Sequence, residues 1–360
     1  MSEGDGMSEG DGVSEAAGVS EAADESDWRI YRGIGEPHGD DLAQKLPPPP
    51  PWRAFDGNPL VDPALAAEHG VTRRLGEMAR AASYRPSAPE VEMVNAALYL
   101  RRPLLVTGKP GTGKSTLAHS VARELELGPV LYWPITSRSD RLEGLYQYDG
   151  IARLQDASLN QSSGARTDLD IGRYIRLGPL GTALLPYQWP RVLLIDELDK
   201  SDIDLPNDLL TLFEAGEYEI RELSRIAREQ PTAEVLIHDG TDHVTITAGE
   251  VRCHEFPLII ITSNGERDFP PPFMRRCLQL RIMPPEEDRL TAIVRAHLGH
   301  DAADRSSELI KTFLEKRKEG DLATDQLLNA IFLAFNQAWP GNRKRLVEAV
   351  MQYLNSSDSL

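Results

Sequence analysis

A glycine-rich loop with a lysine and a hydroxyl residue is the part of this sequence best suited to chemistry. Gly108-Lys-Pro-Gly-Thr-Gly-Lys114-Ser115 follows a short apolar strand, Leu104–Thr107, and opens a helix expected over Ser115–Leu127. This pattern in this setting is a phosphate-binding loop, in which the glycines let backbone N–H groups turn toward a phosphate. The helix N-terminus adds the positive end of its dipole. We expect Lys114 to contact β- and γ-phosphates and Ser115 to offer a hydroxyl to Mg²⁺. The residues assigned to the loop are Gly108, Lys109, Pro110, Gly111, Thr112, Gly113, Lys114, Ser115 and Thr116.

Two adjacent carboxylates end a second apolar strand. Val192-Leu-Leu-Ile195 runs directly into Asp196 and Glu197, about eighty residues after the loop. Asp196 is expected to hold Mg²⁺ through its water shell. Glu197 is placed to orient and deprotonate an attacking water, because a general base must lie within one water of the reacting phosphorus. The loop and the pair together predict binding and hydrolysis of a nucleotide.

The elements that position these residues alternate between strands and helices. Further apolar runs at Val130–Tyr132, Leu258–Thr262 and Leu278–Ile282 are typical of a parallel sheet with crossover helices. After Pro285 the pattern is helical to the end. The predicted helices are Glu286–Leu298, Ser306–Lys318, Thr324–Trp339 and Asn342–Leu354. The expected fold is therefore an α/β P-loop core, with a parallel β-sheet flanked by helices, followed by an all-α lid domain.

The chain divides by composition into a tail, a leader and the two folded domains. Residues 1–27 repeat Met-Ser-Glu-Gly-Asp-Gly imperfectly, and this acidic, apolar-poor composition predicts a disordered tail. Residues 28–63 form a leader with the proline run Pro47–Pro51, which predicts a stiff spacer. The aromatic residues of the leader either staple it onto the core or form a docking motif for a partner. Residues 64–284 are the expected α/β domain and 285–360 the expected lid.

Composition and charge exclude several classes of protein. The formal net charge is −17, with twelve acidic and three basic residues in the first 46, which argues against bulk attraction to nucleic acid. No apolar run reaches the roughly 18 residues of a membrane span, and no cationic, apolar leader opens the chain. A cytoplasmic location is expected. Two cysteines in a chain of this length predict reduced thiols.

The set of motifs resembles an AAA+ ATPase, and more narrowly the MoxR group. Asp196-Glu-Leu-Asp-Lys200 and the helix after it are similar to that group's Walker B region. Leu258-Ile-Ile-Ile-Thr-Ser-Asn264 resembles the fourth core strand, which would make Asn264 the sensor 1 residue that helps to hold the attacking water. The similarity extends roughly from Ser83 to Tyr353. It implies ATP and Mg²⁺ as cofactors and ATP hydrolysis as the reaction.

The same resemblance implies arginines that act on bound nucleotide. Pro271-Pro-Phe-Met-Arg275-Arg276-Cys277 resembles the segment whose arginine fingers reach the nucleotide of a neighbouring subunit, and either Arg275 or Arg276 can fill that role. Pro340-Gly-Asn-Arg343 opens the last lid helix where a sensor 2 arginine is expected, with Arg345 as the alternative. The implied assembly is a homo-oligomeric ring, a hexamer. The implied partner is a protein client or adaptor with a von Willebrand factor A domain.

Two other functions are compatible with these motifs. Related rings include nucleic-acid motors, although the acidic charge and the lack of a recognisable DNA-binding module speak against that function. The other is an ATP-dependent signalling switch with low turnover, which the presence of Glu197 disfavours.

Two inserts interrupt the core pattern. Arg138–Gln188 resembles the insertion that defines the helix-2-insert clade of AAA+ proteins, and Glu234–Val251 alternates as a β-hairpin turning near Asp239-Gly240. Each insert either contacts substrate or only packs subunits together. His238, His243, Cys253 and His254 lie in the hairpin region, but their spacing fits no established zinc pattern.

Overall fold

The structure, a computed structural model, describes residues 28–39, 42–61, 81–163, 170–238, 242–319 and 322–335. Several sequence predictions lie outside these residues. They are the repeat tail 1–27, the hairpin turn at Asp239-Gly240, and the last lid helix with Arg343 and Arg345.

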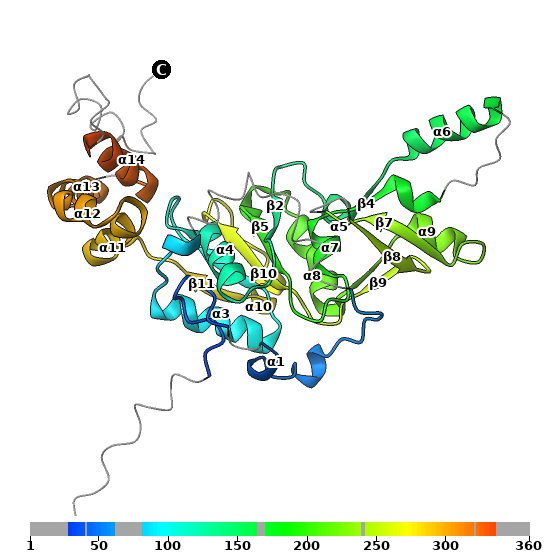
Figure 1. The fold of residues 1–360 in the computed structure, drawn as a ribbon, viewed down its shortest axis with the longest axis horizontal. Coiled ribbons are helices and arrows are strands. Elements are labelled where there is room, and N and C mark those ends of the chain that lie inside the picture. The colour runs from blue at the N-terminus through cyan, green and yellow to red at the C-terminus, as the bar shows by residue number, and fades with distance from the viewer. Residues whose placement is uncertain are drawn as a thin grey trace, which may run out of the picture.

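A five-stranded parallel sheet forms the centre of the molecule, as predicted (Figure 1). Its strands, in spatial order, are β11 (Leu278–Arg281), β1 (Leu104–Thr107), β10 (Leu258–Ser263), β5 (Val192–Asp196) and β2 (Leu131–Pro134). Every pairing within it is parallel. All six residues of β10 are buried, which is why the central strands read as unbroken apolar runs.

Alternate residues of the central strands enter two separate cores. Leu104 and Leu194 pack with the helices α3 (Ala88–Leu100) and α4 (Lys114–Glu124). Leu105 and Leu193 pack on the other face with the following helices. Those helices are α5 (Arg141–Leu145), α7 (Pro179–Ala183), α8 (Leu205–Ala215) and α10 (Pro271–Arg276). The carboxyl ends of β1, β5 and β10 therefore meet at one edge, where the loops carry the candidate site.

The two inserts form one second sheet together with β6, a strand that lies between them in the sequence. Its order is β3 (Tyr146–Tyr148), β4 (Ile175–Leu177), β7 (Thr232–Leu236), β8 (His243–Thr247), β9 (Glu250–Arg252) and β6 (Glu217–Glu219). The antiparallel pairing of β7 with β8 confirms the predicted hairpin. Strands of the first insert join those of the second where β4 pairs with β7. The remaining elements of this region are α6 (Gly150–Ser163), which projects outward in Figure 1, η3 (Ile171–Tyr174) and α9 (Arg221–Ile226).

The helices after β11 form a separate core. They are α11 (Glu287–Leu298), α12 (His300–Arg305), α13 (Ser307–Glu319) and α14 (Thr324–Phe335). Phe313, Leu327 and Ile331 are fully buried in that core. The short helix α12 was not predicted. Gly299, which has a φ of +89°, follows the last residue of α11 and lets the chain turn into α12. Figure 1 shows this lid and the insert sheet at opposite ends of the molecule. Within the part of the chain that the structure describes, no helix has the length and apolar character needed to cross a membrane.

The leader packs into the α/β core through Ile30 and Tyr31. Both side chains are fully buried, and the Asn95 side chain of α3 bonds the backbone of both residues. The Tyr31 hydroxyl lies 3.0 Å from Ser120 Oγ on α4. Further along, the buried carboxylate of Glu124 at the end of α4 accepts three leader N–H groups, from residues 32, 33 and 35. Of the two interpretations of the leader aromatics, these contacts support the staple.

A second anchor of the leader is the buried guanidinium of Arg53, in η1 (Pro51–Arg53). It donates to the carbonyl oxygen of Arg101 at the end of α3 and, at 2.6 Å, to that of Phe213 in the last turn of α8. It also stacks 4.3 Å from the centre of the Phe256 ring. Carbonyls at helix ends have no partner within the helix, so Arg53 closes two helix C-termini at once.

Replacement of Arg53 by alanine is therefore expected to reduce the free energy of unfolding by about 3 kcal/mol, because buried carbonyls of Arg101 and Phe213 lose their donor. Urea unfolding monitored by tryptophan fluorescence measures the change. Arg228→Ala, at an exposed arginine, is the matched control and should change it by less than about 0.5 kcal/mol. An Arg53 variant as stable as the control would show that the leader is only loosely attached.

Candidate functional site

The glycine-rich loop joins the end of β1 to the first turn of α4, as the sequence predicted. Gly111 and Gly113 have φ angles of +72° and +92°, a region that favours glycine. A Cβ on Gly113 would also lie 2.8 Å from the Tyr84 ring. The loop is thus a backbone cradle that larger side chains at Gly113 would obstruct.

Lys114 folds over this cradle and is mostly buried. Its ammonium donates to the carbonyl oxygens of Gly108 and Lys109, at 2.9 and 3.0 Å, and to Asn264 Oδ1 at 2.7 Å. Burial lowers the pKa of Lys114 from its ordinary value, and the nearby carboxylates of Asp196, Asp199 and Glu197 act in the opposite direction. A bound phosphate would therefore replace the weak carbonyl acceptors of the Lys114 ammonium.

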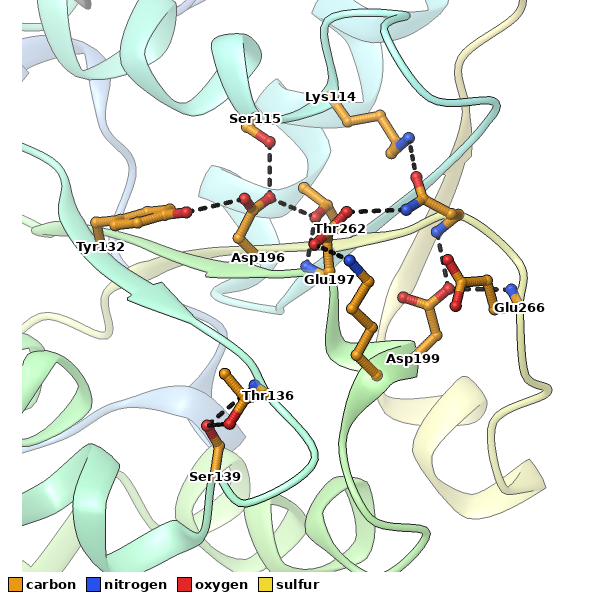
Figure 2. Close-up of polar contacts among 12 residues, drawn as sticks. Lys114, Ser115, Tyr132, Thr136, Ser139, Asp196, Glu197, Asp199, Thr262 and Glu266 are labelled. Carbon is orange, nitrogen blue, oxygen red and sulfur yellow. Dashed lines mark hydrogen bonds and ion pairs between the residues drawn. The ribbon is translucent and has the colours of Figure 1, made fainter. Parts of the chain in front are cut away.

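Oxygen-bearing side chains surround Asp196 at the end of β5. Ser115 Oγ and Thr262 Oγ1 donate to Asp196 Oδ1 at 2.6 and 2.7 Å, and the Tyr132 hydroxyl donates to Oδ2 at 3.2 Å. Figure 2 shows these three hydroxyl groups around the Asp196 carboxylate. Mg²⁺ prefers carboxylate, hydroxyl and water oxygens, so this donor set beside the phosphate cradle fits the ion. Asp196 and Ser115 are the residues that would hold it.

Glu197 is held at both its backbone and its side chain. Its φ is +60°, a left-handed conformation that is costly for a residue with a Cβ, and its N–H donates to Thr262 Oγ1 at 2.8 Å. Asn264 Nδ2 donates to Glu197 Oε1 at 3.0 Å, so the predicted sensor residue does meet the predicted base. Lys200 Nζ lies 2.6 Å from Glu197 Oε2. Strain of this kind is typical of functional sites.

The loop that carries Asn264 is held in place by the side chain of Asp199. This carboxylate is buried, and its Oδ2 accepts the N–H groups of Asn264 and Glu266 at 2.9 and 3.0 Å. Asp199 belongs to η4 (Leu198–Lys200), the turn directly after the Walker B pair. The position of the sensor residue is thereby tied to that of Glu197.

Sequence reasoning assigned no role to Tyr132, Thr262, Asp199 or Lys200 at this site. Thr262 lies near the carboxyl end of β10 and Tyr132 lies within β2, the two strands that flank β5. A polar residue near the end of an apolar strand was the available signal for Thr262. Asp199 and Lys200 belong to the Asp196-Glu-Leu-Asp-Lys200 motif, but only the structure shows their bonding partners.

A cavity of about 550 Å³ opens beside the loop, between the core and the lid. Gly111, Gly113 and Thr116 line it from the core, while Arg289 of α11 and Asp325 of α14 line it from the lid. A larger groove of about 950 Å³ lies along β6, β8 and β9, away from the phosphate loop. The smaller cavity adjoins the phosphate cradle and reaches Thr116 in the first turn of α4, so it is the candidate nucleotide site.

The lid is tied to this cavity through Arg289. Its guanidinium forms an ion pair of 2.8 Å with Glu90, which is almost completely buried at the start of α3, and it donates to the carbonyl oxygen of Arg85. The Tyr84 hydroxyl donates to the same carboxylate, and the Tyr84 ring rests on Gly113 of the loop. The first lid helix is therefore joined to the phosphate loop by a short series of contacts.

The two candidate finger arginines lie at the end of α10 and differ in their surroundings. Arg276 forms an ion pair of 2.6 Å with Glu214 of α8 in the same subunit. Arg275 is exposed, and none of the described residues forms a hydrogen bond or ion pair with its side chain. Among the described residues, neither arginine forms a hydrogen bond or ion pair with the side chain of Lys114, Asp196 or Glu197 in the same chain.

Cys253, in the hairpin region, and Cys277, directly after α10, are buried cysteines. Cys253 is fully buried, and burial raises the pKa of its thiol to about 12; Cys277 is also buried, with its thiol pKa raised to about 12 for the same reason. Both thiols are free. Over the residues described, no group of three or more His, Cys, Asp and Glu side chains could hold a metal ion.

Comparison with known families gives one match. Residues 103–277 match the family model of the AAA domain of the dynein-related subfamily. The matched region starts one residue before β1 and ends one residue after α10, so it includes the phosphate loop, the Asp196-Glu197 pair, Asn264 and both candidate finger arginines. Among characterised proteins, no significant match to the chain was found.

Proposed function

Because residues 103–277 form an AAA domain of the dynein-related subfamily, we propose that the protein is a MoxR-like ATPase that works as a cytoplasmic ring. In this proposal ATP hydrolysis remodels or switches a protein client or adaptor, one that carries a von Willebrand factor A domain. The observation that supports it most is the bonded constellation of Lys114, Asp196, Glu197 and Asn264 beside a glycine cradle.

Each residue of the constellation has a distinct task. Lys114 exchanges its carbonyl acceptors for phosphate oxygens, and the backbone N–H groups of the loop hold the rest of the triphosphate. Asp196 and Ser115 would hold Mg²⁺, which when bound offsets negative charge on the phosphates. Glu197 accepts the proton of the attacking water at its carboxylate, and Asn264 orients that carboxylate.

In a ring, a neighbouring subunit would complete the nucleotide site. Hydrolysis leaves negative charge on the transferred group, and the subunit's own Arg275 and Arg276 are bonded elsewhere or exposed. An arginine from a neighbouring subunit would neutralise that charge. The joined insert sheet extends away from the nucleotide site (Figure 1), where it would be available for a client.

A client-trapping experiment tests this function. A Glu197→Gln ring should bind ATP without turning it over and should therefore retain its client in the ATP state. Purification of that variant with ATP, followed by identification of retained proteins, should give a protein partner that Lys114→Ala does not retain. Sizing with and without ATP should show an oligomer. Stimulation of the wild-type ATPase by DNA, without a retained protein, would favour the nucleic-acid motor instead.

A further inference from the structure

Lys200 contacts the proposed catalytic base, and no part of the proposed mechanism uses it. Its ammonium lies 2.6 Å from Glu197 Oε2, while Asn264 Nδ2 occupies Oε1. Each oxygen of this carboxylate therefore has a donor within the chain. A charge-assisted bond to an ammonium is stronger than one to a neutral amide, so Lys200 is the dominant partner.

The frame around this pair is fixed, and the lysine side chain is its adjustable part. The Lys200 N–H donates to the Glu197 carbonyl oxygen at 2.9 Å, and Asp199 between them holds the loop of Asn264. By contrast, the Lys200 side chain is 42% exposed. The four-carbon stem can thus release Glu197 without any change in the backbone.

A line of contacts connects this lysine to the phosphate loop. Lys114 Nζ donates to Asn264 Oδ1, Asn264 Nδ2 donates to Glu197 Oε1, and Lys200 bonds the other oxygen of Glu197. A phosphate that draws Lys114 away removes the donor at Asn264 Oδ1. Asn264 Nδ2 and Lys200 then still hold one oxygen of Glu197 each.

An ammonium bonded to a base opposes the function of that base. It occupies a carboxylate oxygen that the attacking water needs. Glu197 must therefore lose or weaken this contact to act.

We propose that Lys200 is a positioning residue that restrains Glu197 and so limits the basal rate of ATP hydrolysis. The inference rests on the proposed function, in which Glu197 is the base. It adds a residue of the same subunit that sets how readily the base becomes available, separate from the arginine supplied by a neighbour.

Lys200→Met removes the charge and keeps the length of the side chain. Basal kcat for ATP is expected to rise about 2- to 5-fold, because an exposed ion pair contributes only modestly, and KM should stay within about twofold. Lys200→Arg keeps the cation and should stay near the wild-type rate. Lys311→Met is the matched control, since Lys311 forms an exposed i,i+3 pair with Glu308 on α13, and it should not change kcat.

An unchanged or lower kcat in Lys200→Met would overturn the proposal. A lower kcat would show that Lys200 assists the base.

A second measurement does not depend on turnover. The hydrogen bond to Glu197 raises the pKa of Lys200, which keeps its amine protonated and slow to react. Labelling with an amine-reactive reagent at constant pH should therefore be at least about twofold faster at Lys200 in Glu197→Gln than in the wild type, and unchanged at Lys311. Equal labelling of Lys200 in both proteins would refute the pairing. A wild-type protein that hydrolyses no ATP, but shows the labelling difference, would instead refute the proposed function.

Discussion

Lys114→Ala is expected to lose ATP binding, whereas Glu197→Gln is expected to keep it within about twofold and to lose turnover by at least about 100-fold. The two residues lie in one bonded network, yet their surroundings separate their tasks. Lys114 is buried at the loop and donates to three acceptors, the carbonyl oxygens of Gly108 and Lys109 and Asn264 Oδ1. Alanine leaves the cradle without its positive charge, so phosphates lose their principal counter-charge.

Glutamine at position 197 preserves the shape of the side chain and can still accept from Asn264. It cannot take a proton from water, and the general base contributes about 10²- to 10⁴-fold to rate. Equilibrium titration with a fluorescent ATP analogue measures binding, and phosphate release measures turnover. Each variant is the control for the other. Loss of affinity in Glu197→Gln as large as in Lys114→Ala would contradict the assignment of Glu197 as base.

The phosphate loop and the Walker B strand were predictable because their function depends on local backbone geometry. Glycine at positions 111 and 113 satisfies positive φ angles within one short segment, and β5 must be apolar because both of its faces are covered. The parallel sheet followed from the same apolar runs, and residues 103–277 match the family model of the AAA domain of the dynein-related subfamily. The narrower MoxR resemblance stays a proposal.

Contacts between distant segments were not predictable from patterns along the chain. Thr262 acts on Asp196 and Glu197 from a strand that lies more than sixty residues later, and any buried strand can contain a threonine. Tyr31 of the proline-rich leader packs against α4, and no periodicity in the sequence links these two segments. The joining of the two inserts depends on the β4–β7 pairing, whose partners Arg176 and Leu236 carry no sequence signal for each other.

The second large effect is expected at Arg275. Arg276 already pairs with Glu214 in its own subunit, and Arg275 is the exposed member of the two. We therefore expect Arg275→Ala to reduce turnover about 10³-fold, because a finger stabilises charge that develops only during transfer. ATP affinity should change much less than turnover. Arg276→Ala should mainly remove an exposed ion pair and change turnover by less than about tenfold.

A mixing experiment tests whether Arg275 acts on a neighbour. Arg275→Ala and Lys114→Ala should each be inactive alone. Mixed rings should regain activity, because a Lys114→Ala subunit still presents its arginine to the intact pocket of an Arg275→Ala subunit. Sizing or cross-linking establishes that mixed rings form. Mixed rings with no activity at any ratio would exclude a role in trans, and a wild-type rate for Arg275→Ala alone would exclude any catalytic role. Loss of activity in Arg276→Ala, with Arg275→Ala active, would transfer the finger to Arg276 and make its pair with Glu214 a resting contact that breaks when the ring assembles.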